Sequence, residues 1–271
     1  MAKVKYTYED VKSTYKEVDA PWTVFGVDPF VTPLIYFFAN YTTLSPTFFT
    51  IFGMGLAILS FFSFLQGTQP YLIVGAILFE LAFWCDCIDG KLARLTEKSS
   101  PEGAFFELLL DQGRMLLVTM GIAYGQFRLK GDYSILIMGL CYVIFHFFWF
   151  ALWNIWGKAN RMRLEKYNIE YDRDMEIKAK KEALKKNNKP KGLRNKIGLF
   201  AFKHRILARY SSVEIDTVVF LIFPILSAPI TGLKVGLILW ALLTAFKTLD
   251  FSTKICRPPK LFSSPEDDAG I

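Results

Sequence analysis

Trp84-Cys-Asp-Cys-Ile-Asp-Gly-Lys-Leu-Ala-Arg94 and, after a short polar link, Gly103-Ala-Phe-Phe-Glu-Leu-Leu-Leu-Asp-Gln-Gly-Arg114 are the two segments that decide the fold. Each belongs to an apolar stretch that reads as a membrane helix, and each carries two carboxylates near the end that faces the link. Carboxylates inside a hydrophobic segment are costly to bury and usually mark a functional site. We therefore expect the function of the chain to reside between these two segments.

Helical spacing places the four acids on two stripes. Asp86 and Asp89 are three residues apart, so on a helix they lie about 60° apart on one face. Glu107 and Asp111 are four residues apart and form a second stripe. Four facing carboxylates would repel one another strongly unless a cation lay between them. Because hard oxygen ligands suit Mg²⁺, Mn²⁺ or Ca²⁺, the sequence predicts a divalent metal site between two helices.

The small residues beside the first pair of acids indicate space for a substrate. Gly90 and Ala93 fall on the face of Asp86 and Asp89, so that face is nearly bare of side chains. A nucleotide can lie against such a face, and Arg94 at the helix end can pair with a phosphate. Acids within a membrane can also mark an ion pathway or a proton relay, but a conduit requires neither this placement of small residues nor a fixed spacer.

The residue pattern of the two segments resembles the signature of the CDP-alcohol phosphotransferases, also called CDP-alcohol phosphatidyltransferases. That signature has eight fixed positions with fixed gaps. The positions that match here are Asp86, Asp89, Gly90, Ala93, Arg94, Gly103 and Asp111. The departure is Glu107, where the family pattern has Asp, so the charge is kept but the carboxylate lies one methylene farther from the backbone.

The resemblance implies roles for the matching positions. The ligands of the metal, expected to be two Mg²⁺ or Mn²⁺ ions, would be Asp86, Asp89, Glu107 and Asp111. Asp111 would also be the base that deprotonates the acceptor hydroxyl. The residues bordering the cytidine nucleotide and its phosphates would be Gly90, Ala93, Arg94 and Gly103.

The resemblance also implies the reaction. A phospholipid-synthesising transferase of this kind would move a phosphatidyl group from CDP-diacylglycerol to a polar alcohol and release CMP. The alternative within the class moves a phospho-alcohol from a soluble CDP-alcohol to a diacylglycerol. From another class, a non-catalytic membrane subunit or cation carrier remains open. The family further implies a homodimer.

The acceptor pocket is less sharply indicated. The candidate polar residues are Arg114, Arg209, Glu214, Asp216 and Lys247. Basic side chains suit a phosphorylated acceptor such as glycerol 3-phosphate, whereas acidic ones suit an amine or a polyol. Both signs are present, so composition leaves the acceptor open. His146 stands among aromatic residues of an apolar stretch, and we expect it to be a core residue with its nitrogens satisfied.

Composition predicts an integral membrane protein of the all-α class. Of the 271 residues, 52% are hydrophobic and 16% aromatic, which is too apolar for an ordinary soluble domain. The apolar stretches predict six transmembrane helices, at roughly 46–66, 69–95, 102–127, 133–156, 213–228 and 232–250. An aromatic stretch over 21–41, interrupted by Asp28 and two prolines, predicts a helix lying at the membrane interface. The predicted parts are a cytosolic N-terminus with this interfacial helix (1–44), a six-helix catalytic domain (45–254) and a cytosolic tail (255–271).

Charge predicts the orientation in the membrane. The net charge is +7, and 17 lysines and arginines lie in a polar insert over 158–210, against about three in the opposite loops. By the positive-inside rule the insert, both termini and the acidic site are cytosolic, most simply in a plasma membrane. The insert predicts a solvated helix over 163–186, and its stretch 197–209 predicts either an interfacial helix or a membrane-adjacent linker. Basic residues follow no aromatic-interleaved pattern, which argues against nucleic-acid binding, and four scattered cysteines indicate no disulfide framework.

Overall fold

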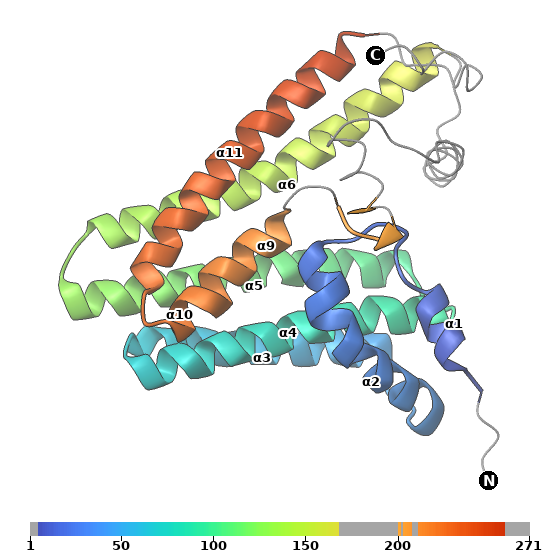
Figure 1. The fold of residues 1–271 in the computed structure, drawn as a ribbon, viewed down its shortest axis with the longest axis horizontal. Helices are drawn as coiled ribbons and strands as arrows, with labels where there is room; N and C mark the ends of the chain where they lie inside the picture. The colour runs from blue at the N-terminus through green and yellow to red at the C-terminus, as the bar shows by residue number, and fades with distance from the viewer. Residues whose placement is uncertain (1–4, 168–199, 202, 208–210, 258–271) are drawn as a thin grey trace.

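The computed structural model describes residues 5–167, 200–201, 203–207 and 211–257, and in these residues the chain is helical (Figure 1). The one extended pairing among them is an isolated bridge between Asp19 and Ile206. The elements, in chain order, are α1 Tyr8–Ser13, the π-helical η1 Thr23–Val27, α2 Asp28–Tyr41, α3 Pro46–Gln66, α4 Gln69–Leu95, α5 Pro101–Lys130, α6 Ser134–Lys166, α9 Ser212–Thr217, the π-helical η2 Val218–Ile222, α10 Phe223–Ile225 and α11 Pro229–Ile255.

Local sequence signals set the ends of the long helices. Ser45 and Ser100 are N-caps whose side chains accept hydrogen bonds from backbone amides, and each is followed by a proline in the first turn. Proline is favourable there because its missing N–H would have no helical partner. Gly67 and Gly131 end α3 and α5 with φ of 72° and 68°, in the left-handed region that glycine adopts without strain.

In the part of the chain that the structure describes, four helices are long and apolar enough to cross a membrane: α3, α4, α6 and α11. The first two have the bounds that the apolar pattern predicts. The helix predicted over 133–156 is longer in the structure, because α6 continues to Lys166, into the polar insert. Basic residues in that last turn, Arg163 and Lys166, favour the extension since they face the negative end of the helix dipole. The helix expected over 163–186 and the interfacial helix expected over 197–209 lie largely outside the described residues.

The long helices pack around one main core. Figure 1 shows α6 and α11 as a long pair that rises away from the layer of α3, α4 and α5, with α9 and α10 between the two groups. The largest buried side chains of the core come from both groups, among them Phe64, Tyr142, Phe220 and Trp240. Helices α3 and α5 approach closely at Gly125, where a Cβ would lie 2.1 Å from the carbonyl oxygen of Phe64. Only glycine permits this approach.

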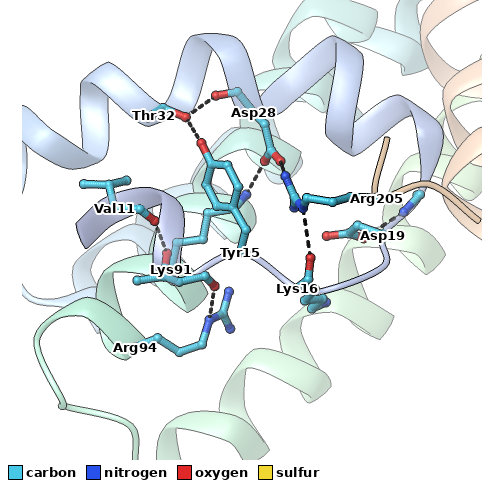
Figure 2. Close-up of polar contacts among 11 residues, drawn as sticks. Val11, Tyr15, Lys16, Asp19, Asp28, Thr32, Lys91, Arg94 and Arg205 are labelled. Atoms are coloured by element: carbon cyan, nitrogen blue, oxygen red, sulfur yellow. Dashed lines mark hydrogen bonds and ion pairs between the residues drawn. The ribbon is translucent and has the colours of Figure 1, made fainter. Parts of the chain in front are cut away.

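A buried ion pair ties the N-terminal region to the end of α4. Lys91 Nζ lies 2.7 Å from Asp28 Oδ1, and both side chains are about 95% buried. Arg205 approaches the other oxygen of Asp28 at 3.5 Å and donates from Nε to the carbonyl of Lys16 (Figure 2). Arg94 Nε donates to the carbonyl of Thr14 at 2.9 Å. The segment 14–19, helix α2 and the segment around Arg205 are therefore all held against the helix that carries the acids.

Replacing Lys91 by Met should destabilise the protein strongly. Asp28 would keep only the longer contact to Arg205, and removing one partner of a buried pair costs about 3–5 kcal/mol. Thermal unfolding of the detergent-purified protein measures the loss. The matched control is Lys12→Met, which breaks the exposed pair with Glu9 and should leave the unfolding temperature nearly unchanged, because exposed pairs contribute little to stability. Equal losses in the two variants would contradict the structural role of the buried pair.

Candidate active site

Three carboxylates from two helices meet at one point. Asp86 and Asp89 of α4 and Glu107 of α5 each offer an oxygen, and these oxygens all lie within 4.8 Å of one another. The spacing along each helix brings this about, because the acids project from facing stripes near the ends joined by the link 96–100. Like charges at this separation are unfavourable without a compensating cation. The group could hold a divalent metal ion.

The fourth acid lies one turn farther along α5. Asp111 forms an ion pair with Arg114, which follows it by three residues on the same helix. The Arg114 side chain is 10% exposed and that of Asp111 33% exposed. Arg114 Nε has no hydrogen-bond partner within the described parts of the chain. Asp111 is thus oriented by a nearly buried guanidinium while keeping an accessible oxygen.

A hydroxyl from α3 completes the surroundings of Asp89. Thr50 Oγ1 donates to Asp89 Oδ2 at 2.7 Å. The other oxygen of Asp89 is buried and has no hydrogen-bond partner among the residues described. A buried carboxylate oxygen without a donor is costly, and a divalent cation would satisfy it. The donor set of hard oxygens fits Mg²⁺ or Mn²⁺.

Two cavities adjoin the acidic group. The larger, of about 210 Å³, is bounded by α4, α5, α6, α9 and the N-terminal region. The smaller, of about 20 Å³, lies between α3, α4 and α5 and is lined by Thr50 and Asp89. The residues that line both are Asp86, Glu107, Asp111 and Arg114. The smaller space admits about one water-sized particle, so the carboxylates lie between an ion-sized pocket and a larger cavity.

The larger cavity is lined by the backbone of α4 at Gly90. A Cβ added there would lie 3.5 Å from the Arg94 guanidinium and 3.9 Å from a Glu107 oxygen. The bare backbone of α4 therefore has a cation on one side and the acidic group on the other, which suits a phosphate-bearing ligand. Ala93 and Gly103 are not among the residues that line either cavity.

Of the candidate acceptor residues, the cavity includes Arg114 and Asp216. Asp216 Oδ1 accepts a hydrogen bond from the Tyr142 hydroxyl at 2.7 Å. Arg209 lies outside the described residues.

The other two candidates have structural partners. Glu214 accepts from the backbone N–H of Trp22 at 3.1 Å and, with Ser211, forms the capping box at the start of α9. Lys247 is buried, with Nζ 4.8 Å and 5.3 Å from the ring centroids of Trp153 and Phe251. Neither lines the larger cavity.

Several cavity residues carry no signal in the sequence. The N-terminal region contributes Lys16, Asp19 and Thr23, and α6 contributes His146. Only His146 gave a signal in the sequence, as a lone ionisable residue in an apolar stretch, where it was interpreted as a core residue. The three N-terminal residues reach the cavity through contacts with distant parts of the chain, which no local pattern reveals.

Residues 43–246 match the family model of the CDP-alcohol phosphatidyltransferases. The match covers most of the chain, and the chain belongs to this family. The prediction made from the eight-position signature is thereby confirmed. This family consists of transferases that synthesise phospholipids. The four apolar helices of the described residues indicate that this member is a multi-pass membrane protein.

A curated relative is similar over part of its length. An uncharacterized protein from Aquifex aeolicus (strain VF5) is 34% identical over 98 residues, which are 35% of this chain and 47% of the relative. The matched region thus spans about half the length of that relative.

Thr50→Val should weaken divalent-metal binding. Valine keeps the shape of threonine but removes the donor to Asp89, and loss of such an outer hydrogen bond lowers metal affinity by about 10- to 100-fold. Mn²⁺ titration of the purified protein, followed by electron paramagnetic resonance of the free ion, measures the affinity. Thr50→Ser keeps the hydroxyl and should bind nearly as the natural protein does. Equal affinity in the Val and Ser variants would show that the hydroxyl does not position Asp89 for a metal.

Proposed function

We propose that this protein transfers the phosphatidyl group of CDP-diacylglycerol to a polar alcohol and releases CMP. The observation that carries the proposal is the meeting of Asp86, Asp89 and Glu107 within 4.8 Å, beside a cavity that Gly90 lines. An acidic group of this kind requires a cation, and a cation between carboxylates takes phosphate oxygens as further ligands.

The bond changes assign a task to each residue. The acceptor oxygen attacks the phosphatidyl phosphorus, a new P–O bond forms, and the bond to the bridging oxygen breaks so that CMP leaves. Bound divalent ions, two Mg²⁺ or Mn²⁺, would be held by Asp86, Asp89 and Glu107 and would neutralise the charge of the diphosphate. Asp111 takes the proton of the attacking hydroxyl, and its pairing with Arg114 holds the carboxylate in place.

The substrate face of the site follows from the same geometry. Arg94 pairs with a donor phosphate, since its guanidinium lies 3.5 Å from the position of a Cβ on Gly90. Gly90 leaves the room for the nucleotide, and Ala93 and Gly103 belong to the same proposed nucleotide surface by their place in the family signature.

The proposed membrane arrangement has six transmembrane spans. Four are the apolar helices α3, α4, α6 and α11, and the other two are α5 and the α9–α10 region. Helix α5 runs from Pro101 to Lys130, a length of about 45 Å that suffices for a span. Helix α2 exposes Phe30, Leu34 and Phe37 while burying Val31 and Ile35, which suits a helix resting at the membrane interface. The clustering of basic residues in 158–210 supports a cytosolic site in the plasma membrane. The domain limits at 44/45 and 254/255 and the homodimer stay predictions.

Release of CMP tests the proposed reaction. Purified protein with Mg²⁺ or Mn²⁺, CDP-diacylglycerol and a panel of alcohols should release CMP and form a new phospholipid. If CMP is released only when a soluble CDP-alcohol is combined with diacylglycerol, the donor is the soluble substrate and the acceptor is the lipid, which is the reverse of the proposal. No CMP from any pair of donor and acceptor, together with no nucleotide binding, would identify a non-catalytic subunit.

Asp111→Asn should abolish turnover while nucleotide binding remains. The amide has the size of the carboxylate but cannot take the proton, and loss of a general base lowers the rate by about 10²- to 10⁴-fold. Steady-state kcat and the Kd for CMP measure the two effects. Glu102→Gln, at an exposed position in the first turn of α5, is the control and should keep the natural rate. An active Asn variant would remove Asp111 from the proposed chemistry.

A further inference from the structure

His146 is a buried polar side chain that the protein itself leaves unsatisfied. It is 7% exposed and lines the larger cavity from α6. Neither ring nitrogen has a hydrogen-bond partner in the described part of the chain. The nearest rings, those of Phe147 and Trp240, meet it edge-on and offer no acceptor in the plane of the imidazole. The described residues thus leave His146 without a hydrogen bond, although buried polar groups normally find a partner.

A carboxylate from another helix shares this cavity. Asp216 of α9 lines it, with one oxygen accepting from the Tyr142 hydroxyl at 2.7 Å. Tyr142 is one helical turn before His146 on α6, so the two residues lie on the same face of that helix. An imidazole and a carboxylate together offer donors and acceptors for hydroxyl or amino groups.

The proposed base connects this pair to the acidic group. Asp111 and Arg114 line the same cavity as His146 and Asp216. A ligand held by His146 and Asp216 is thus close to the carboxylate that would take its proton. The larger cavity then has two functions: α4 and α5 face the donor diphosphate, and α6 and α9 face the acceptor.

The charges of the wall discriminate among acceptors. Lys91 is paired with Asp28 and Arg114 with Asp111, so these two cations are already neutralised. Among the described residues of the wall, the other two cations are Lys16 of the N-terminal region and Arg94 at the end of α4, the residue proposed to pair with a donor phosphate. A phosphate on the acceptor would meet the carboxylates of Asp111 and Asp216, which repel it.

We propose that His146 and Asp216 form the subsite for the acceptor alcohol, and that this acceptor is an unphosphorylated polyol or amino alcohol. The inference rests on the proposed function and specifies its second substrate. His146 holds a hydroxyl other than the one that reacts, while the reacting hydroxyl gives its proton to Asp111. His146 is a specificity-determining residue and takes no part in bond breaking.

The test separates the two substrates kinetically. CMP release is measured with glycerol, myo-inositol, serine and ethanolamine, and with glycerol 3-phosphate and inositol 1-phosphate. At least one unphosphorylated compound should support turnover and the phosphorylated ones should not. In His146→Phe the KM for that acceptor should rise about tenfold, the order expected for one lost hydrogen bond, with the KM for CDP-diacylglycerol unchanged. His146→Asn, which keeps a donor and an acceptor, should recover part of the loss, and Asp216→Asn should also raise the acceptor KM.

Controls distinguish the possible failures. His204→Phe changes a histidine that lines neither cavity and should leave both KM values as they are. Thermal unfolding and CMP binding establish that each variant is folded. If His146→Phe does not fold, the acceptor KM of Asp216→Asn provides the test. Turnover with phosphorylated acceptors only, or an unchanged acceptor KM in the folded variants, would overturn the inference while leaving the proposed function intact. No CMP release by the natural protein with any acceptor would overturn both.

Discussion

The electrostatic repulsion among three carboxylates, confined within 4.8 Å between two helices of an apolar chain, is the constraint on which the site depends. Neighbouring side chains compensate part of this repulsion. Thr50 donates to Asp89, and Arg114 pairs with Asp111. One oxygen of Asp89 still has no partner among the described residues, so the protein's own groups do not complete the compensation. A site of this kind is organised around something that it binds, and the family to which the chain belongs acts on charged diphosphates.

Much of the fold could be predicted because its signals are local. Serine and proline at the start and glycine at the end fixed α3, and the four-residue spacing placed the acids of α5 on one stripe. The signature was readable for the same reason, since Asp86 and Asp89 belong to one helix and the link to α5 is short. The end of α6 was harder, because a helix whose last turns are polar has no change of hydropathy where it stops.

The parts of the site that could not be predicted depend on contacts between distant residues. The bond from Thr50 to Asp89 joins positions 39 apart, and a threonine in an apolar helix usually bonds to its own backbone. Glu214 and Asp216 looked equivalent in the sequence, yet one caps a helix and the other lines the cavity. His146 gave a signal, but only the packed helices reveal that its nitrogens have no partner among the described residues.

The contacts around Asp28 bear on how the chain is assembled in the cell. Translation delivers Asp28 and Lys91 early, but Arg205, which approaches the second oxygen of Asp28, emerges only after α6 has been synthesised. The pairing of Asp19 with Ile206 waits for the same moment. A ribosome stalled before this point would leave the nascent N-terminal region without its last partners. Completion of the contacts around Asp28 is therefore a late event of biogenesis, and truncated products would lack the partners that the segment around Arg205 supplies.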